Sequence, residues 1–298
     1  MKNPDPILIN NLFGIDWLDI HWYGLLIVVG IIIAIFLADH EVKRRKLPPD
    51  TAIDLCLVCI PSGLIGARLY YVIFSLDQFH SISDVLNIMD GGLAIYGMLI
   101  GGLLGAFIYM KVKRLSFLHA LDIILPCVAI AQAIGRWGNF FNQEAFGPVV
   151  TNPNHMWFPL AVKIDRLNEL HYATFFYESM WCLLVFIVLW FIVRKKAKHL
   201  GDVALVYVIL YGLERMFVEL MRTDSLMLGS VRVSHILSLI LCVGGIAFAI
   251  IRYIKETKIG YRIWPRDASY SSAGDSQDTE DSVNVEAAEF GTESENPS

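Results

Sequence analysis

The chain has 298 residues, of which 55% are apolar and 18% are charged, and its mean hydropathy is +0.53. Soluble domains carry about 25% charged residues, so this composition excludes an ordinary soluble protein and indicates an integral membrane protein. The formal net charge of −5 argues against a nucleic-acid partner, and all five cysteines lie in apolar stretches, which excludes the disulfide framework of a small secreted protein.

The N-terminal residues lack the basic, apolar and small-residue pattern of a cleaved signal peptide, so residues 1–20 are expected to be a retained extracytoplasmic segment. Apolar runs long enough to cross a bilayer follow at about 21–38, 52–74, 92–110, 117–134, 174–193, 203–220 and 233–251. Residues 21–254 are therefore predicted to form an all-α membrane domain of seven transmembrane helices.

The basic residues predict how these spans are oriented. Lys and Arg cluster after the first, third, fifth and seventh runs, at 43–46, 111–114, 194–198 and 252–266. Because basic residues accumulate in cytoplasmic loops, the predicted N-terminus lies outside and the C-terminus lies in the cytoplasm.

Two segments lie outside the predicted spans. Residues 135–173 form a long connection between spans four and five, which we expect to be an extracytoplasmic loop and small head; within it, 156–164 could supply a strand or two. Residues 255–298 begin as a basic cytoplasmic stretch and end in a tail from 267 that has nine acidic residues and no Lys or Arg. This composition is typical of a disordered tail, and it accounts for the negative net charge.

Charged side chains within or next to the predicted spans are the first functional candidates, because a charge in a membrane is costly and usually faces a cavity or a partner. They are Asp54, Arg68, Asp122, Arg136, Glu144, Glu178, Glu214, Arg215, Glu219 and Arg222. For Arg68, close to the end of a span, a structural role is plausible because its long stem can reach the interface.

The densest group of charges lies in the sixth predicted span. At 100° per residue, Tyr211, Arg215, Glu219 and Arg222 fall within about 80° of one another on a helix. Arginines aligned near a membrane surface favour an anion site, since the planar guanidinium matches a phosphate. The alternative is a structural ion pair between Arg215 and Glu219, which are four residues apart.

A second polar group, Gly135-Arg-Trp-Gly-Asn-Phe-Phe-Asn-Gln-Glu-Ala-Phe-Gly147, follows the fourth predicted span. Its glycines are expected to permit sharp turns that leave backbone amides near a ligand, and Arg136, Asn139 and Asn142 supply donors. A third stretch has glycines at helical spacing, at Gly97, Gly101 and Gly105, which favours close helix packing. Tyr96 in the same stretch is an interfacial anchor or a site residue.

No metal or cofactor is predicted. The histidines show no paired ligand spacing such as H-E-x-x-H, and the C-x-x-C at Cys56 and Cys59 has apolar flanks typical of small core residues. These observations predict a seven-span protein with an anion-binding cavity opening to the outer leaflet, most simply for a phospholipid headgroup. They are also compatible with two other functional classes, a lipid transporter and a seven-span receptor.

Six ordered motifs between Trp22 and Ser238 resemble the prolipoprotein diacylglyceryl transferase family. They are the 135–147 signature, Trp22-Tyr-Gly-Leu25, Gly91-Gly-Leu-Ala-Ile-Tyr-Gly-Met-Leu-Ile-Gly-Gly102, Ala173-Thr-Phe-Phe-Tyr-Glu178, Tyr211-Gly-Leu-Glu-Arg-Met-Phe-Val-Glu-Leu-Met-Arg222 and Val233-Ser-His-Ile-Leu-Ser238. The resemblance implies a multi-pass enzyme of the bacterial cytoplasmic membrane, with an active site facing the outer leaflet and no cofactor. The implied reaction transfers a diacylglyceryl group from phosphatidylglycerol to the lipobox cysteine of preprolipoproteins.

The resemblance also implies roles for individual residues. Arg136 and Arg215 match the two essential arginines of the family, and Glu144, Glu219 and Tyr96 are further catalytic candidates. Residues implied to bind phosphatidylglycerol are Arg136, Asn139, Gly147, Tyr23, Tyr211 and Arg222.

Three positions depart from the family pattern. Tyr96 stands where some relatives have a histidine proposed to help the thiol lose its proton, Ala173 replaces a usual proline, and His235 replaces a usual glutamine. A phenol with a pKa near 10 is a poor base at neutral pH. We therefore expect the two arginines to activate the thiol, with Glu144 or Glu219 as possible proton acceptors.

Overall fold

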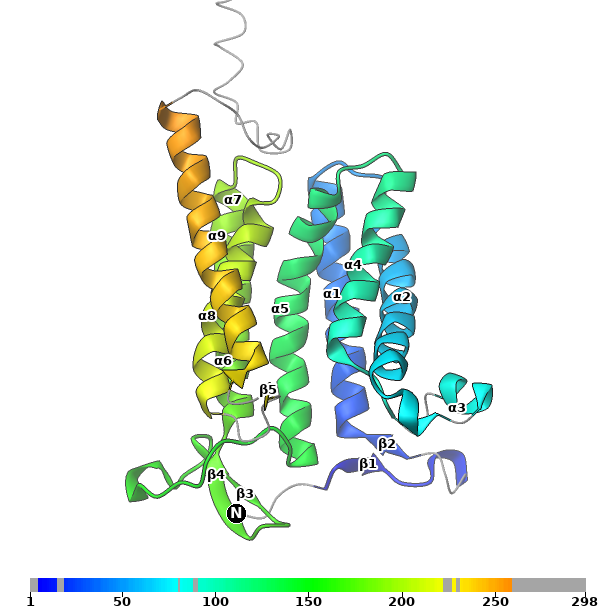
Figure 1. The fold of residues 1–298 in the computed structure, drawn as a ribbon, viewed down its shortest axis with the longest axis vertical. Helices are drawn as coiled ribbons and strands as arrows, with labels where there is room; N and C mark the ends of the chain where they lie inside the picture. The colour runs from blue at the N-terminus through cyan, green and yellow to red at the C-terminus, as the bar shows by residue number, and fades with distance from the viewer. Residues whose placement is uncertain are drawn as a thin grey trace, which may run out of the picture.

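The computed structural model of the chain describes residues 5–14, 19–79, 81–87, 91–221, 227–228 and 231–258. The molecule is a bundle of long helices (Figure 1). They are α1 (Trp22–Arg44), α2 (Thr51–Phe74), α4 (Ile95–Val112), α5 (Phe117–Asn142), α6 (Thr174–Ile187), α8 (Asp202–Met221) and α9 (Val233–Lys258), and α6 continues through a π-helical turn, Val188–Val193, into α7 (Arg194–Lys196). Each predicted span overlaps one of these helices.

Six stretches of helix are long and apolar enough to cross a membrane, which makes the chain an all-α, multi-pass membrane protein. They lie in α1, α2, α4, α5, α9 and in α6 continued through α7. Among the described long helices, only α8 fails this test, because it carries Asp202, Glu214, Arg215 and Glu219 within 20 residues.

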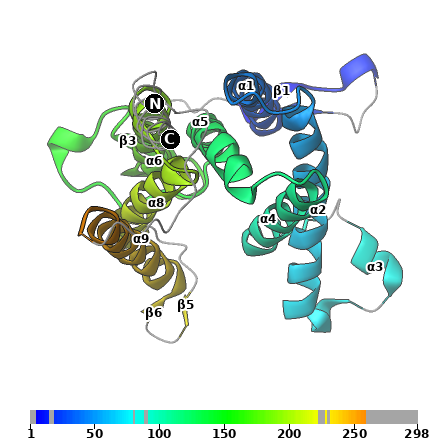
Figure 2. The same ribbon diagram turned by 90° about the horizontal axis from the view of Figure 1, so that it is seen from above.

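Helix α5 lies between two groups of helices, with α1, α2 and α4 on one side and α6, α8 and α9 on the other (Figure 2). The helix is also longer than predicted. It continues through Asn142 and ends where Gln143 adopts a left-handed conformation, with φ at 51°. The prediction that the connection begins at residue 135 is therefore wrong, because Gly135 and Gly138 continue the helix and make no turn.

Small elements gather at the end of the bundle where α5 finishes, which we call the head end (Figure 1). Strands β3 (Ala161–Ile164) and β4 (Glu169–Tyr172) form an antiparallel hairpin in which Ala161 pairs with Tyr172. The hairpin buries Val162 and Ile164 against aromatic side chains that include Trp137 and Phe140. One strand thus forms within residues 156–164, as expected.

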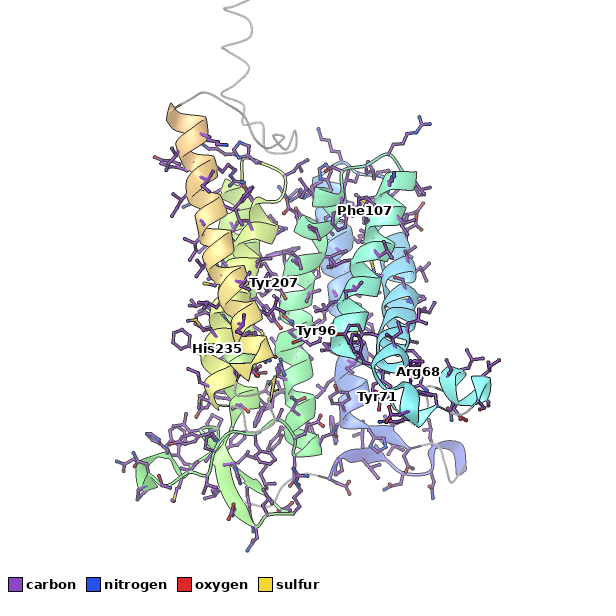
Figure 3. The ribbon with its side chains drawn as sticks, viewed as in Figure 1. Arg68, Tyr71, Tyr96, Phe107, Tyr207 and His235 are labelled. Carbon is purple, nitrogen blue, oxygen red and sulfur yellow. The ribbon has the colours of Figure 1, made fainter. Side chains whose placement is uncertain are left out.

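The remaining short elements are β1 (Ile7–Ile9), β2 (Ile20–His21), β5 (Met227–Leu228), β6 (Val231–Arg232), α3 (Ile82–Leu86) and the single turns Leu12–Gly14, Leu76–Gln78 and Pro153–His155. Arg68 on α2 holds the segment around α3, because its guanidinium donates to the carbonyl oxygens of Val85 at 2.8 Å and Asn87 at 2.7 Å (Figure 3). The plausible structural role of Arg68 is confirmed.

Glycines allow α2 and α4 to pack backbone against backbone. A Cβ on Gly101 would lie 3.0 Å from the carbonyl carbon of Ser62 and 3.1 Å from the Cα of Gly66. A Cβ on Gly102, one residue further, would meet only the oxygen of Cys59 at 3.7 Å. The close-packing interpretation of these glycines is confirmed.

We expect Gly101→Ala to destabilise the protein by about 1–3 kcal/mol, because the added methyl group overpacks a backbone contact. The matched variant Gly102→Ala should be neutral or slightly stabilising, since alanine favours a helix by about 1 kcal/mol over glycine. Thermal unfolding of the two purified variants in the same detergent measures the difference. Equal unfolding temperatures would contradict this view of the α2–α4 contact.

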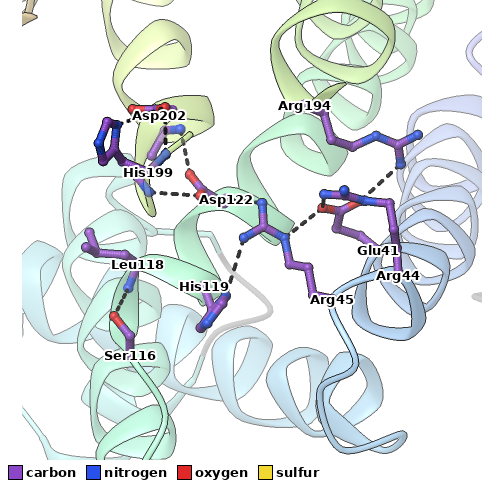
Figure 4. A network of polar contacts seen from close by, with 12 residues as sticks. Glu41, Arg44, Arg45, Ser116, Leu118, His119, Asp122, Arg194, His199 and Asp202 are labelled. Carbon is purple, nitrogen blue, oxygen red and sulfur yellow. Dashed lines mark hydrogen bonds and ion pairs between the residues drawn. The ribbon is translucent and has the colours of Figure 1, made fainter. Parts of the chain in front are cut away.

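The end opposite the head is held by a buried network of charges (Figure 4). Glu41 on α1 accepts from Arg45 at 2.7 Å and from Arg194 at 3.0 Å, and it also pairs with Arg44. Asp122 on α5 accepts from the backbone amides of Gly201 at 2.8 Å and Ala204 at 3.0 Å, so it caps the start of α8 from a neighbouring helix. Arg45 also pairs with Asp122 at 3.4 Å, so the network joins α1, α5, α7 and α8.

Candidate active site

Three helices bring charged side chains together toward the head end. Arg136 on α5 places its Nε 2.5 Å from Oε2 of Glu178 on α6. Arg215 on α8 places Nη1 3.5 Å from Oε1 of the same carboxylate and Nη2 2.8 Å from Oε2 of Glu219. Glu178 therefore bridges the two arginines that the sequence predicted as a pair.

The carboxylates of this cluster are more buried than its arginines. Glu178 is 2% exposed and Glu219 is 1% exposed, whereas the side chains of Arg136 and Arg215 are 21% and 13% exposed. The acidic groups thus lie behind the guanidinium groups, and it is the guanidinium groups that a ligand can reach.

Hydrogen bonds between α5 and α6 fix the register that brings Arg136 to Glu178. The indole of Trp137 donates to Oγ of Ser179 at 3.1 Å, and this hydroxyl donates to the carbonyl oxygen of Ala133 at 2.7 Å. Because Trp137 follows Arg136 and Ser179 follows Glu178 in sequence, this pair of bonds aligns the charged residues beside them.

Two acidic residues of the cluster were missing from the predicted site. Glu178 appeared among the charged residues of the spans and in a family motif, but no role was assigned to it. Glu214, one residue before Arg215, is 4% exposed, and its Oε1 has no hydrogen-bond partner within the described part of the chain. Its charge interacts with Glu178, Arg136 and Arg215. The sequence signal for both was an acidic residue inside an apolar run.

The polar face predicted on the sixth span is found on α8 for those of its residues that the structure describes. Tyr211 stacks on Tyr207 with ring centroids 5.6 Å apart, and Tyr207 donates to Gln132 on α5 at 3.1 Å. Arg215 and Glu219 follow on the same helix and form the ion pair that was the structural alternative, so the ion pair and the arginine pair exist together. The prediction for Arg222 lies outside the described residues.

Tyr23 and Asn139 lie near the same end of α5. The ring of Tyr23 on α1 packs over Gly138, where an added Cβ would be 3.0 Å from Cε2 of that ring. Asn139 is half-buried, and its backbone oxygen accepts from the amide of Glu144 at 3.1 Å. Gly138 is thus a packing residue for α1 and α5.

Tyr96 reaches across the bundle. Its hydroxyl lies 3.3 Å from Oγ of Ser234, so it connects α4 with α9 at the front of the bundle (Figure 3). The ring also packs near Tyr70, with centroids 6.4 Å apart. None of the contacts that the structure describes for Tyr96 involves Arg136 or Arg215.

Glu144 and Gly147 lie apart from the arginine pair. Glu144 is exposed and accepts from Asn142 at 3.4 Å. Gly147 is buried in the head, where a Cβ would be 3.0 Å from Cβ of Tyr172 and 3.2 Å from Cγ2 of Thr174. In the described residues neither one contacts Arg136 or Arg215.

The arginine pair has the chemistry of a phosphate site. Two guanidinium groups from different helices converge, and each offers several N–H donors in a planar fork that suits phosphate oxygens. Among the described residues, no group of three His, Cys, Asp or Glu side chains is arranged to hold a metal ion. The site described here presents two guanidinium groups, each paired with a carboxylate, to an anionic ligand.

Comparison with known proteins identifies the family. A family model described as prolipoprotein diacylglyceryl transferase matches residues 10–251. Curated proteins named phosphatidylglycerol–prolipoprotein diacylglyceryl transferase are similar over most of their length. The Clostridium perfringens protein, number 1 of that name, is 44% identical over 80% of this chain and 92% of its own. The Streptococcus equi subsp. zooepidemicus protein is 43% identical over 84% of this chain and 96% of its own length. The Clostridioides difficile protein is 43% identical over 79% of this chain and 90% of its own length. The chain therefore belongs to the prolipoprotein diacylglyceryl transferase family.

Proposed function

We propose that this protein transfers the sn-1,2-diacylglyceryl group of phosphatidylglycerol to the thiol of the lipobox cysteine in preprolipoproteins, the first step of bacterial lipoprotein maturation. The products are a thioether and glycerol 1-phosphate. The proposal is supported by the names of relatives that match over most of their length, and the observation that carries it is the convergence of Arg136 and Arg215 on Glu178. Family membership favours this enzyme over a transporter or a receptor.

The proposed chemistry is a displacement at carbon. The thiolate sulfur attacks the glyceryl carbon that carries the phosphate, a sulfur–carbon bond forms, and the carbon–oxygen bond breaks with its electron pair going to the phosphate. Negative charge grows on the leaving phosphate in the transition state. Arg136 and Arg215 stabilise that charge, and a site shielded from water strengthens their effect.

The proposed placement in the membrane uses all seven long helices as spans. Residues 1–20 and the head lie outside, residues 255–298 lie in the cytoplasm, and the arginine pair faces the outer leaflet of the bacterial cytoplasmic membrane. The corrected head segment is 143–173. The basic clusters at the opposite ends of the helices support this orientation. Helix α8 is proposed as the sixth span because Arg215 and Glu219 pair with each other, Arg215 also pairs with the buried Glu178, and Asp202 at its start pairs with Arg252.

The predicted site residues are proposed to contact the bound substrates. Tyr23, Asn139, Gly147, Tyr211 and Arg222 are the proposed phosphatidylglycerol-binding residues besides Arg136. Glu144 and Glu219 are the proposed further catalytic groups, and Tyr96 is proposed to orient the substrate. Of these two acidic candidates, Glu219 contacts Arg215, whereas Glu144 is exposed and lies apart from the arginine pair.

The two arginines are proposed to activate the thiol without help from the Tyr96 hydroxyl. An ordinary cysteine has a pKa near 8.5, and adjacent positive charge lowers it. We expect Tyr96→Phe to slow transfer by at most about fivefold, because a neutral hydrogen bond such as the one to Ser234 contributes about 1 kcal/mol. A loss of about 10²-fold or more would instead assign the phenol a part in proton transfer. Initial rates of peptide modification, with Tyr96→His measured beside Tyr96→Phe, decide between these outcomes.

The function is tested by reconstituting the full chain in vesicles with a lipobox peptide. Vesicles containing phosphatidylglycerol should give a diacylglyceryl-modified peptide, whereas vesicles of phosphatidylethanolamine or of cardiolipin should not. A peptide with the cysteine replaced by serine is the matched control. Absence of modification with phosphatidylglycerol, or equal modification with all three lipids, would contradict the proposed function.

A further inference from the structure

Both arginines of the candidate active site are already paired with acidic groups. The two terminal nitrogens of Arg215 each face a different carboxylate, Glu178 at 3.5 Å and Glu219 at 2.8 Å. Arg136 engages Glu178 through Nε at 2.5 Å. A phosphate that binds here must therefore share or displace these resident anions.

Two carboxylates face the two arginines of the cluster within the described residues. Glu178 contacts both guanidinium groups, and Glu219 contacts that of Arg215. Pairing of this kind weakens the attraction of an arginine for another anion, because part of its field is already neutralised. Tight phosphate binding is thus not what this arrangement favours.

The proposed reaction makes weak binding of the product useful. The substrate phosphodiester carries one negative charge, whereas the leaving phosphomonoester has a second ionisable oxygen with a pKa near 6 and is close to doubly charged at neutral pH. Two uncompensated arginines would therefore hold the product more tightly than the substrate. Product release limits many enzymes, so a site that attracts the leaving group needs a means of letting it go.

We propose that Glu178 is a positioning residue that competes with the phosphate for Arg136 and Arg215 and so promotes release of glycerol phosphate. This inference rests on the proposed function. While a ligand is bound, the phosphate takes over part of the arginine contacts; when the carbon–oxygen bond has broken, Glu178 regains both guanidinium groups and the product leaves. Its burial behind the arginines lets Glu178 do this without contacting the reacting carbon.

The test is direct binding of glycerol 1-phosphate to the full-length protein in lipid nanodiscs, which does not depend on turnover. Glu178→Gln keeps the size of the side chain and removes its charge, so glycerol 1-phosphate should bind about tenfold or more tightly, the effect of one charge-assisted hydrogen bond. A purely structural role predicts the opposite sign, because a disordered arginine pair would bind the product more weakly. Unchanged or weaker binding overturns the proposal.

Kinetics supply a second measurement on the same variant. In Glu178→Gln later turnovers should be slowed more than the first by retained product, and KM for phosphatidylglycerol should fall. Glu178→Asp, which keeps the charge, should bind glycerol 1-phosphate as weakly as the wild type. A slow first turnover with an unchanged KM would overturn the proposal.

Control variants separate this proposal from folding defects and from the proposed function. Glu41→Gln makes the same change in the buried charge network at the opposite end of the bundle, and it should leave the affinity for glycerol 1-phosphate unchanged. If Glu178→Gln does not fold, Glu219→Gln removes another counter-charge from Arg215 and should also tighten binding of glycerol 1-phosphate. Unchanged or weaker binding by Glu219→Gln overturns the proposal.

The outcomes also separate this proposal from the proposed function. A wild-type protein that transfers no lipid refutes the proposed function itself, whereas normal transfer with unaltered product affinity in the variants refutes only the role of Glu178.

Discussion

Replacing either Arg136 or Arg215 with alanine is expected to slow diacylglyceryl transfer by about 10²–10³-fold or more, the usual cost of removing one donor that stabilises transition-state charge. The two guanidinium groups converge on one carboxylate from different helices, so neither can substitute for the other. Initial rates of lipobox-peptide modification in phosphatidylglycerol vesicles measure the loss.

Lysine variants at these positions separate charge from geometry. Arg136→Lys and Arg215→Lys keep the positive charge but lose the planar fork that binds two phosphate oxygens at once, so both should remain strongly impaired. Arg166→Ala is the matched control, because Arg166 is exposed in the head and packs over Phe146. Full activity in an alanine variant of Arg136 or Arg215 would refute the assignment of the leaving-group site.

Glu41→Ala is expected to cause the largest loss of stability, about 3–5 kcal/mol, because removing one partner of a buried ion pair leaves charges buried without compensation. Glu41 is 1% exposed and contacts three arginines, of which the Arg45 side chain is fully buried. Its loss would release α1 from α7 at the end opposite the head. The effect is measured by heating the variant in detergent and recording the fraction of protein that stays monodisperse at each temperature.

A matched control lies two residues earlier on the same helix. Asp39 pairs with Lys43 at 2.6 Å, but their side chains are 34% and 68% exposed, and exposed ion pairs contribute about 0–1 kcal/mol. Asp39→Ala should therefore unfold at nearly the wild-type temperature. Equal stability of the Glu41 and Asp39 variants would show that the buried network is not what holds this end together.

The helices were predictable because the membrane imposes a simple pattern, an apolar run of about 20 residues for each span. The same pattern predicted the wrong end for α5, at about residue 134 in place of Asn142. Gly135, Arg136 and Gly138 interrupt the apolar run and suggest a loop, yet the helix continues because the glycine at 138 gives room for the ring of Tyr23. A polar end of a helix that packs against its neighbours cannot be told from a loop by composition.

The arginine pair was predictable in part. Helical periodicity placed Arg215, Glu219 and Tyr211 on one face, the polar group at 135–147 supplied Arg136, and the family resemblance paired the two arginines. The bridging role of Glu178 was missed because it depends on how α6 packs between α5 and α8, which periodicity within one helix does not reveal. Basic residues were likewise misjudged: Arg45 and Arg194 were counted as loop charges, but both are buried in the network around Glu41.

We infer that the arginine pair stabilises a phosphate leaving group while sulfur displaces it from carbon. This mechanism is tested most directly with phosphatidylglycerol that carries a heavy-oxygen label at the bridge between the diacylglyceryl carbon and phosphorus, followed by mass spectrometry of both products. We expect a peptide that gains one unlabelled diacylglyceryl group and a glycerol phosphate that carries all of the label. A peptide without the diacylglyceryl mass, or label that stays with the lipid, would contradict it.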